Sequence, residues 1–334
     1  SDNTALGADS LKANTTGTSN VAIGKGAYQG TTGSQNTVVG TSAMDGTNTG
    51  DNNTAIGRYA LLVNTSGAGN TAVGASALQA NTTAANNTAV GLTALSANTT
   101  GAYNVAMGYD ALSANTTGTN NTVVGANAGV GVTTGTENTL IGFQAGAWDN
   151  DLTTGIRNTI IGSHTNMSAV GINYETTIGY NATGNGASTV TFGIGAAETY
   201  ITVGGTSWSG SSDERLKKNI TTSTAGLSFI NDLHPITFEW KNKGDIPPEL
   251  KGYEEGSTEK YNLNDKVNHG FVAQEVKAVI DAHPEIGSGH SIWTEKPEGT
   301  QAIADGQLVP MLVKAIQELS TKVEDLEKQL NNKE

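Results

Sequence analysis

Residues 70–83 read NTAVGASALQANTT, and this stretch is one copy of a pattern that fills the first half of the chain. Its central glycine recurs every 17 residues, apart from one interval of 16 and one of 20. An asparagine stands four residues before each of these glycines. The glycines are Gly7, Gly24, Gly40, Gly57, Gly74, Gly91, Gly108, Gly125, Gly142 and Gly162. A fixed period of this length is the sequence signature of a repeat architecture.

Each copy holds two short apolar bursts, such as Ala72-Val73 and Ala77-Leu78, and closes on an Asn-Thr-Thr-Gly turn. Seventeen residues cannot bury a core alone, so we expect each copy to be one rung that stacks on its neighbours. Glycine and asparagine are expected at the corners, where φ is positive. Because the apolar residues are mostly Ala and Val, we expect several chains to share the core. Ten stacked rungs would span about 50 Å.

The composition excludes several classes of function. The formal net charge of -13 disfavours a nucleic acid or an anionic membrane as partner, since both require a positively charged face. No cysteine is present, which excludes disulfides and zinc-thiolate sites. No apolar run approaches the roughly 20 residues of a membrane span. The five histidines lack metalloprotease spacing, and no glycine cluster matches a nucleotide-binding motif, so we predict neither a cofactor nor a metal.

The chain divides into physically different modules. Residues 1–200 hold four Lys or Arg and no proline, whereas the rest of the chain holds the other fourteen cations and all six prolines. We predict a repetitive β shaft over 1–180. A β neck and linker is predicted over 181–210, with strands near 189–192 and 199–203. A separate module is predicted over 211–334.

An apolar seam near the C-terminus indicates oligomerisation. Its members alternate in steps of four and three, which predicts a coiled coil over 308–331. They are Leu312, Ile316, Leu319, Val323, Leu326 and Leu330. β-branched residues at a with Leu at d favour two strands in model peptides, so this seam by itself does not predict a trimer.

The repeats resemble the left-handed parallel β-roll of trimeric autotransporter adhesin heads, whose copies also carry an Asn-x-Ala-Val/Ile-Gly core. The resemblance covers roughly residues 1–180 and implies a three-chain rod rather than a catalytic scaffold. That family has a shorter repeat, which leaves the coil geometry open.

The stretch SDERLKKNI at 212–220 resembles the opening motif of the endosialidase-type intramolecular chaperone. Three further motifs follow in order: ITFEWK at 236–241, GFVAQEV at 270–276 and LVPML at 308–312. The resemblance implies the trimerising C-terminal domain of phage tail fibres and tailspikes, which is often removed by self-cleavage. The predicted fold is therefore a mainly β shaft, a trimeric parallel β-roll or solenoid of about ten 17-residue repeats. An α+β chaperone domain ending in a coiled-coil helix follows it.

A cleavage site follows from the same resemblance. In that family a serine at the start of the motif and a lysine five positions on form the catalytic dyad, and these map to Ser212 and Lys217. A serine hydroxyl needs a base, and a lysine can serve when burial lowers its pKa. Ser212 Oγ would attack the carbonyl carbon of Ser211 and cut between these two residues. The activity would be at most a single-turnover serine autoprotease, with no turnover on other substrates.

Other residues of the motifs are expected to support this dyad. Asp213 and Arg215 would be orienting or structural residues, and Gln274 and Glu275 belong to the third motif. A structural alternative remains open, because Ser212-Asp213 before a leucine-containing stretch is also an ordinary helix N-cap.

Together these features predict a homotrimeric, host-adhesion tail fibre of a phage virion, synthesised in the host cytoplasm and acting outside it. Its partner would be a host-cell receptor, either glycan or protein. The alternative is a bacterial trimeric surface adhesin that retains the same chaperone. A depolymerase would need an acidic pair in a cleft, but the acidic residues before 201 are scattered. Five aromatic residues are candidates either to stack on a sugar or to pack against rungs: Tyr28, Tyr59, Tyr103, Tyr109 and Trp148.

Overall fold

The computed structural model describes residues 2–147, 152–205, 207–210, 212–262, 266–286, 291–296 and 299–333. These residues form two compact units, Ser1–Leu216 and Lys217–Glu334. Trp148 and Ser211 lie outside the described residues.

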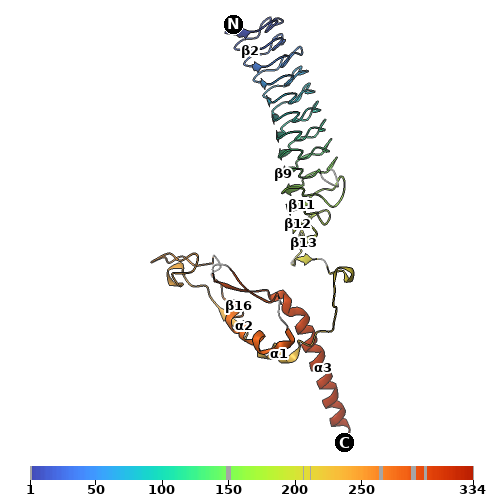
Figure 1. Ribbon diagram of the computed structural model, residues 1–334, viewed down its shortest axis with the longest axis vertical. Coiled ribbons are helices and arrows are strands. Elements are labelled where there is room, and N and C mark those ends of the chain that lie inside the picture. The colour runs from blue at the N-terminus through green and yellow to red at the C-terminus, as the bar shows by residue number, and fades with distance from the viewer. Residues whose placement is uncertain are drawn as a thin grey trace. The chain divides into compact units, whose positions relative to one another are not determined.

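The first unit is a long parallel β-solenoid of about eleven turns, as the repeat predicts (Figure 1). Each turn contributes a short strand that pairs in parallel with the strand of the next turn. The register is 17 residues, such as Thr71 on Thr88, but 16 between β2 and β3 and 20 between β9 and β10. The strands are β1 (Thr4–Leu6), β2 (Val21–Ile23), β3 (Thr37–Val39), β4 (Thr54–Ile56), β5 (Thr71–Val73), β6 (Thr88–Val90), β7 (Val105–Met107), β8 (Thr122–Val124), β9 (Thr139–Ile141), β10 (Thr159–Ile161) and β11 (Thr176–Tyr180).

The solenoid ends in a change of strand direction. Strand β12 (Thr189–Ile194) still pairs in parallel with β11, but β13 (Ala197–Thr202) returns antiparallel to β12. Strand β14 (Ser209–Gly210) pairs with β13 and completes a 14-stranded sheet. The strands expected near 189–192 and 199–203 are therefore present.

One chain encloses the solenoid core. From β2 to β10 the middle strand residue points inward. Where the next corner carries an Ala-Leu pair, that pair points inward as well, and Ala72, Ala77 and Leu78 are fully buried. Small alanines on the strand leave room for the leucines opposite. Burial within a single chain therefore does not require the shared core that the composition suggested.

The repeated asparagines also point inward, where they form a ladder along the solenoid. Asn70 Oδ1 accepts a hydrogen bond from the backbone N of Asn87 at 3.0 Å, and Asn70 Nδ2 donates to the carbonyl of Ala84 at 2.9 Å. The same bonds repeat turn by turn and end where Glu175 N donates to Asn158 Oδ1 at 2.9 Å. Each buried amide is thereby satisfied by the turns beside it.

A second ladder joins the asparagines of the closing turns, from Asn48 to Asn115, through contacts such as Asn81 Nδ2 to Asn64 Oδ1 at 2.7 Å. Asn81 is buried, so the recurring Asn-x-Thr pattern here is a structural ladder. The expected positive φ occurs at glycines and at some asparagines, but the asparagines of this ladder do not adopt it. Glycines such as Gly91 (φ +138) and residues just before the first ladder, such as Asn86 (φ 59), take those conformations.

The strand-ending glycines are required by close packing between turns. A Cβ added to Gly91 would lie 2.3 Å from the carbonyl oxygen of Gly108 in the next turn. Its φ of +138 lies in a region that residues with a side chain rarely adopt. The recurring glycine therefore allows consecutive turns to stack at β-sheet distance.

The short turn between β2 and β3 uses a tyrosine where other turns use leucine and asparagine. Tyr28 is buried, and its Oη donates to the carbonyl of Gly33 at 2.8 Å. One turn earlier Asn14 Nδ2 makes the equivalent bond to Gly17 O at 3.0 Å. Asn36 Nδ2 donates to the same Tyr28 Oη at 3.0 Å. Burial raises the pKa of Tyr28 to about 12, so the phenol stays protonated as a donor.

The second unit is a small α+β region followed by a long helix. Its described strands form two antiparallel pairs, β15 (Ile236–Phe238) with β16 (Asn268–Gly270) and β17 (Trp293–Glu295) with β18 (Gln301–Ile303). The helices are α1 (Leu227–Asp232), α2 (Ala273–Ala282) and α3 (Val309–Asn331), with 3₁₀ turns η2 (Lys243–Asp245), η3 (Pro284–Ile286) and η4 (Asp305–Leu308). The buried core is Phe229, Leu233, Val276, Ile280, Ile292 and Leu308.

Helix α3 supports α1 directly. Helix α1 has no side-chain cap of its own at Gly226, and the Glu318 carboxylate of α3 accepts a hydrogen bond from Leu227 N at 2.9 Å. This bond, together with Lys314, lowers the pKa of Glu318. A Cβ on Gly226 would lie 2.7 Å from a Glu318 carboxylate oxygen, so glycine allows the approach.

Candidate functional site

The segment that carries the predicted dyad is short and exposed. Ser212 and Lys217 are both exposed, and the 3₁₀ turn η1 (Glu214–Leu216) lies between them in the chain. A lysine acts as a base on a serine when it is buried, and a single chain does not bury Lys217. Ser211, the other side of the predicted cleavage site, lies outside the described residues.

Asp213 and Arg215 organise this segment. Asp213 Oδ1 accepts a hydrogen bond from the backbone N of Arg215 at 2.9 Å, and its backbone carbonyl accepts one from Leu216 N at 3.1 Å. The Arg215 guanidinium also contacts both carboxylate oxygens, with Nη2 to Oδ2 at 2.5 Å. This bond raises the pKa of Arg215. Asp213 thus caps a single 3₁₀ turn, which is the structural role that its position before Leu216 suggested.

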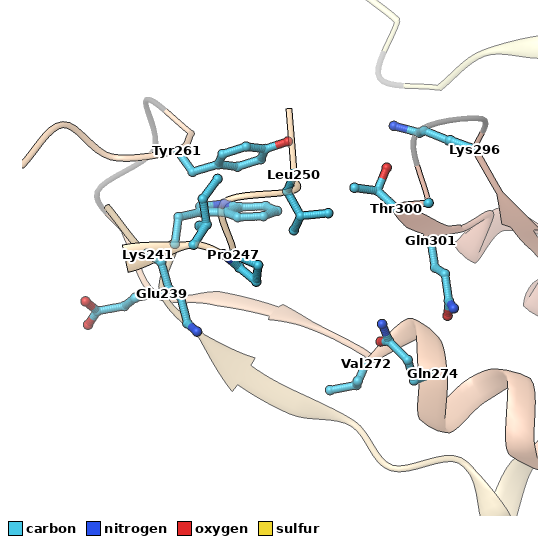
Figure 2. Close-up of a pocket in the computed structure, with 13 residues that line it drawn as sticks. Glu239, Lys241, Pro247, Leu250, Tyr261, Val272, Gln274, Lys296, Thr300 and Gln301 are labelled. Carbon is cyan, nitrogen blue, oxygen red and sulfur yellow. The ribbon is translucent and has the colours of Figure 1, made fainter. Parts of the chain in front are cut away.

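Gln274 lines a cavity of about 830 Å³ in the second unit. Figure 2 shows Tyr261, Leu250 and Pro247 on one side and Thr300 and Gln301 on the other. Gln274 comes from the first turn of α2, between these two walls. Neither member of the predicted dyad is among the described residues that line it.

The cavity is aromatic and apolar on one wall and amide-rich on the other. The rings of Trp240 and Tyr261 lie 6.0 Å apart at 36°. Glu239 is the single carboxylate among the described lining residues, and Lys241 and Lys296 are the cations. Hydrolysis of a glycoside commonly needs two carboxylates across the scissile bond, and the described lining residues include one.

Glu275 lies one residue further along α2 and makes a different contact. Its Oε2 lies 3.2 Å from Nδ1 of His234, and both side chains are exposed. Gln274 and Glu275 therefore separate, with the amide toward the cavity and the carboxylate toward a histidine at the surface.

A histidine cluster in the second unit was not predicted from the sequence. His283 is nearly buried, with Nε2 2.7 Å from Asp232 Oδ2 and Nδ1 2.6 Å from Glu285 Oε1. The two carboxylates raise the pKa of His283, Glu285 first and Asp232 second. With both ring nitrogens bonded to carboxylates, the imidazolium ties the end of α1 to the end of α2. In the sequence only Glu285 stands near His283, two residues further along the chain.

The aromatic residues of the first unit differ in exposure. Tyr28 is buried, so the suggestion that it stacks on a sugar is wrong. Tyr59 is half-buried, whereas Tyr103 and Tyr109 are exposed at 61% and 49%. These last two remain the described candidates for surface contacts.

The described residues contain neither a metal-binding cluster nor a membrane-spanning helix. Within the described residues no group of three or more His, Cys, Asp or Glu is placed to hold a metal ion. Among the helices described here, none is long and apolar enough to cross a membrane.

The long helix α3 exposes most of its predicted seam. Leu312, Leu319 and Val323 are 43%, 51% and 47% exposed, and Ile316, Leu326 and Leu330 are each 64% exposed. Ala315, on another side of the helix, is buried near α1. An apolar row of this length on one face is typical of a helix that associates with other helices.

Comparison with known proteins found a family model that matches part of the C-terminal region. No curated protein and no solved structure matched the chain. Residues 212–284 match the family model described as chaperone of endosialidase. This match begins at Ser212 and covers the segment from the dyad to His283. The chain is thus a parallel β-solenoid joined to a chaperone-of-endosialidase domain, an arrangement that fits a tail fibre with a C-terminal chaperone.

Proposed function

We propose that this protein is the distal part of a homotrimeric phage tail fibre that adheres to a host-cell surface. The C-terminal unit acts as an intramolecular chaperone that brings three chains together so that their solenoids fold side by side. The observation that carries the proposal is the chaperone-of-endosialidase match at 212–284 in the same chain as a β-solenoid.

The exposed seam of α3 supports association of the chains. Six apolar side chains in a row on one helix face are costly in water, because each gains roughly 1.5–3 kcal/mol when buried. Association of three α3 helices buries them and aligns the chains at their C-terminal ends. Parallel solenoids need this alignment, since a slip of one turn leaves the first and last turns unpaired.

Assembly of the chains would trigger the chemistry of the dyad. Ser212 and Lys217 are exposed in one chain, but a lysine base needs burial. A second chain packed against the 212–217 segment would supply that burial, so cleavage would follow assembly rather than precede it. Ser212 Oγ would then attack the carbonyl carbon of Ser211, the Ser212 amine would leave with a proton, and water would hydrolyse the resulting ester.

Intact and native mass spectrometry on freshly expressed protein tests this proposal. We expect a trimer cut between Ser211 and Ser212, with both Ser212→Ala and Lys217→Ala trimeric and uncut. Lys218→Ala is the matched control, because it removes the neighbouring exposed lysine and should leave cleavage unchanged. A trimer of full-length wild-type chains would reject autoproteolysis but keep the chaperone role, whereas a monomer would reject both.

A retained domain would favour the second candidate, a bacterial trimeric surface adhesin. The observation behind it is the repeat itself, since the solenoid copies carry the Asn-x-Ala-Val/Ile-Gly core of adhesin heads. Cell fractionation of the native source separates the two, because a virion fibre co-purifies with phage particles and an adhesin with the cell envelope.

A further inference from the structure

One face of the solenoid is built from the outward positions of its strands, and we call it the strand face. In each strand from β1 to β11 the first and third residues point outward. Twenty of these twenty-two side chains are Thr, Val or Ile, and the other two are Leu6 and Met107. None of the twenty-two is charged.

The third positions form an unbroken apolar column. Its members come from every turn between Leu6 and Ile178, and seven of the eleven are classed as exposed, between 36% and 67%. The seven are Leu6, Ile23, Ile56, Val90, Met107, Val124 and Ile141. A column of this length is unusual on a surface that meets only water.

Charge in the solenoid lies at the corners instead. Lys25 and Arg58, for example, each follow a strand-ending glycine and are exposed. The same corner carries exposed Leu92, Tyr109 and Phe143 in later turns, so its character changes along the molecule. The third positions of the strand face stay apolar from the first turn to the last.

The uniform apolar column indicates which partner can cover the strand face. A partner that covers the column along its whole length must present apolar groups at the spacing of the turns, about 4.8 Å. A second copy of the same solenoid, parallel and in register, has that spacing over the same number of turns. Neutral Thr and β-branched side chains also allow two identical faces to meet without like charges in contact.

We propose that the strand face is the surface through which copies of this chain pack against one another in the fibre. The inference rests on the proposed trimer and adds the face and the register of its contacts. It assigns an interior position to the Val/Ile column and leaves the charged and aromatic corners on the outside.

The size of the face explains why a chaperone is needed. A strip about 50 Å long and two side chains wide covers on the order of 500 Å². A stable interface usually buries about 800 Å² on each partner. The strand face falls short of that value, so the solenoids associate once the C-terminal units hold the chains together.

Cysteine crosslinking tests the face, because the chain has no cysteine of its own. Val90→Cys places a thiol on the strand face, and the control Thr83→Cys places one on an exposed corner of the preceding turn. A short bis-maleimide bridges facing sheets, which pack about 10 Å apart. We expect covalent dimers from Val90→Cys on a denaturing gel and at least tenfold less from Thr83→Cys. Native mass measurement of each unreacted variant reports the trimer separately.

The outcomes separate the inference from the proposal on which it rests. A trimer that crosslinks at Val90→Cys supports the face. Because each chain then has a single cysteine, the crosslink joins equivalent positions of two chains, which also supports the register. A trimer that crosslinks at Thr83→Cys, or at neither site, overturns the strand face and leaves the fibre proposal intact. A monomer overturns both. Ile56→Cys and Ile141→Cys repeat the test in other turns, so failure of one variant to fold does not decide it.

Discussion

The two units of this chain differ in the partners that their buried residues contact. In the solenoid the partner of a buried residue is usually its equivalent one turn away, as with Asn70 and Asn87. In the C-terminal unit a buried residue can meet an unlike partner distant in sequence, as His283 meets Asp232. The solenoid encloses a continuous core, whereas helix α3 of the second unit leaves an apolar seam exposed.

This contrast shows where each unit depends on something outside itself. A solenoid turn is stabilised by the turns next to it and can repeat as often as the sequence repeats. Among its described residues the C-terminal unit has a core cluster of six buried side chains, and the apolar seam of α3 stays exposed to solvent. In the proposed fibre the second unit would therefore act first and the first unit would follow.

The largest effect is expected from a substitution that separates two turns. Gly91→Ala places a Cβ 2.3 Å from the Gly108 carbonyl oxygen at a φ of +138. We expect a loss of about 4 kcal/mol or more, from backbone strain plus the clash, and a thermal midpoint lowered accordingly. Gly186→Ala is the control, because its φ is +115 and nothing lies within 4 Å of the added Cβ. An equal loss in both variants would show that stacking distance is not what the glycine provides.

Next in size is the loss of association through α3. Ile316→Asp puts a charge into the seam, and we expect the trimer to dissociate at concentrations on the order of 100-fold higher than the wild type. Gln317→Asp adds the same charge to the neighbouring exposed position outside the seam and should leave assembly unchanged. Native mass measurement over a dilution series distinguishes them. Equal behaviour of the two variants would contradict a coiled-coil role for the seam.

Within the solenoid, the ladders predict a graded loss. Asn98 makes three side-chain bonds, to Asn81 Oδ1 at 3.2 Å, to Gly101 O at 2.9 Å and from Asn115 Nδ2 at 2.9 Å. In the described part of the chain Asn115 Oδ1 has no hydrogen-bond partner, because the ladder ends there. We expect Asn98→Ala to cost about 2–3 kcal/mol and Asn115→Ala about 1 kcal/mol less, measured by thermal unfolding. The reverse order would contradict a ladder that is stabilised cooperatively along its length.

The smallest effect is a pH dependence confined to the second unit. The pKa of His283 is raised by Glu285 and Asp232, so its stabilising contribution is complete below the unfolded value of 6.5. The contribution is lost as pH rises through the folded pKa. We expect the free energy of unfolding of the second unit to fall by less than about 1 kcal/mol between pH 6 and pH 8, with a correspondingly small fall in its thermal midpoint. His283→Gln should remove this slope, whereas His234→Gln, at an exposed pair, should preserve it.

The sequence predicted the solenoid because the repeat period recurs from copy to copy, so the glycine and leucine positions could be aligned without a structure. It did not predict that Asn70 and its equivalents point inward, because asparagine is equally typical of turns. Nor did it predict the His283 cluster, whose members Asp232 and Glu285 come from separate segments. The dyad residues were predicted from the motif at 212–220. Their proposed burial depends on partner chains, whose positions cannot be read from the sequence of one chain.

Tyr28 shows how the solenoid accommodates a turn of different length. A turn that is one residue shorter than its neighbours still makes the hydrogen bond to its closing carbonyl, that of Gly33, because the Tyr28 phenol takes the place of the asparagine. A deletion in one turn is therefore repaired inside that turn and is not passed to the next. The length of the rod can then drift by gain or loss of whole copies, while small errors within a copy are absorbed locally. Fibres of different reach can arise from one sequence pattern in this way, with the C-terminal unit unchanged.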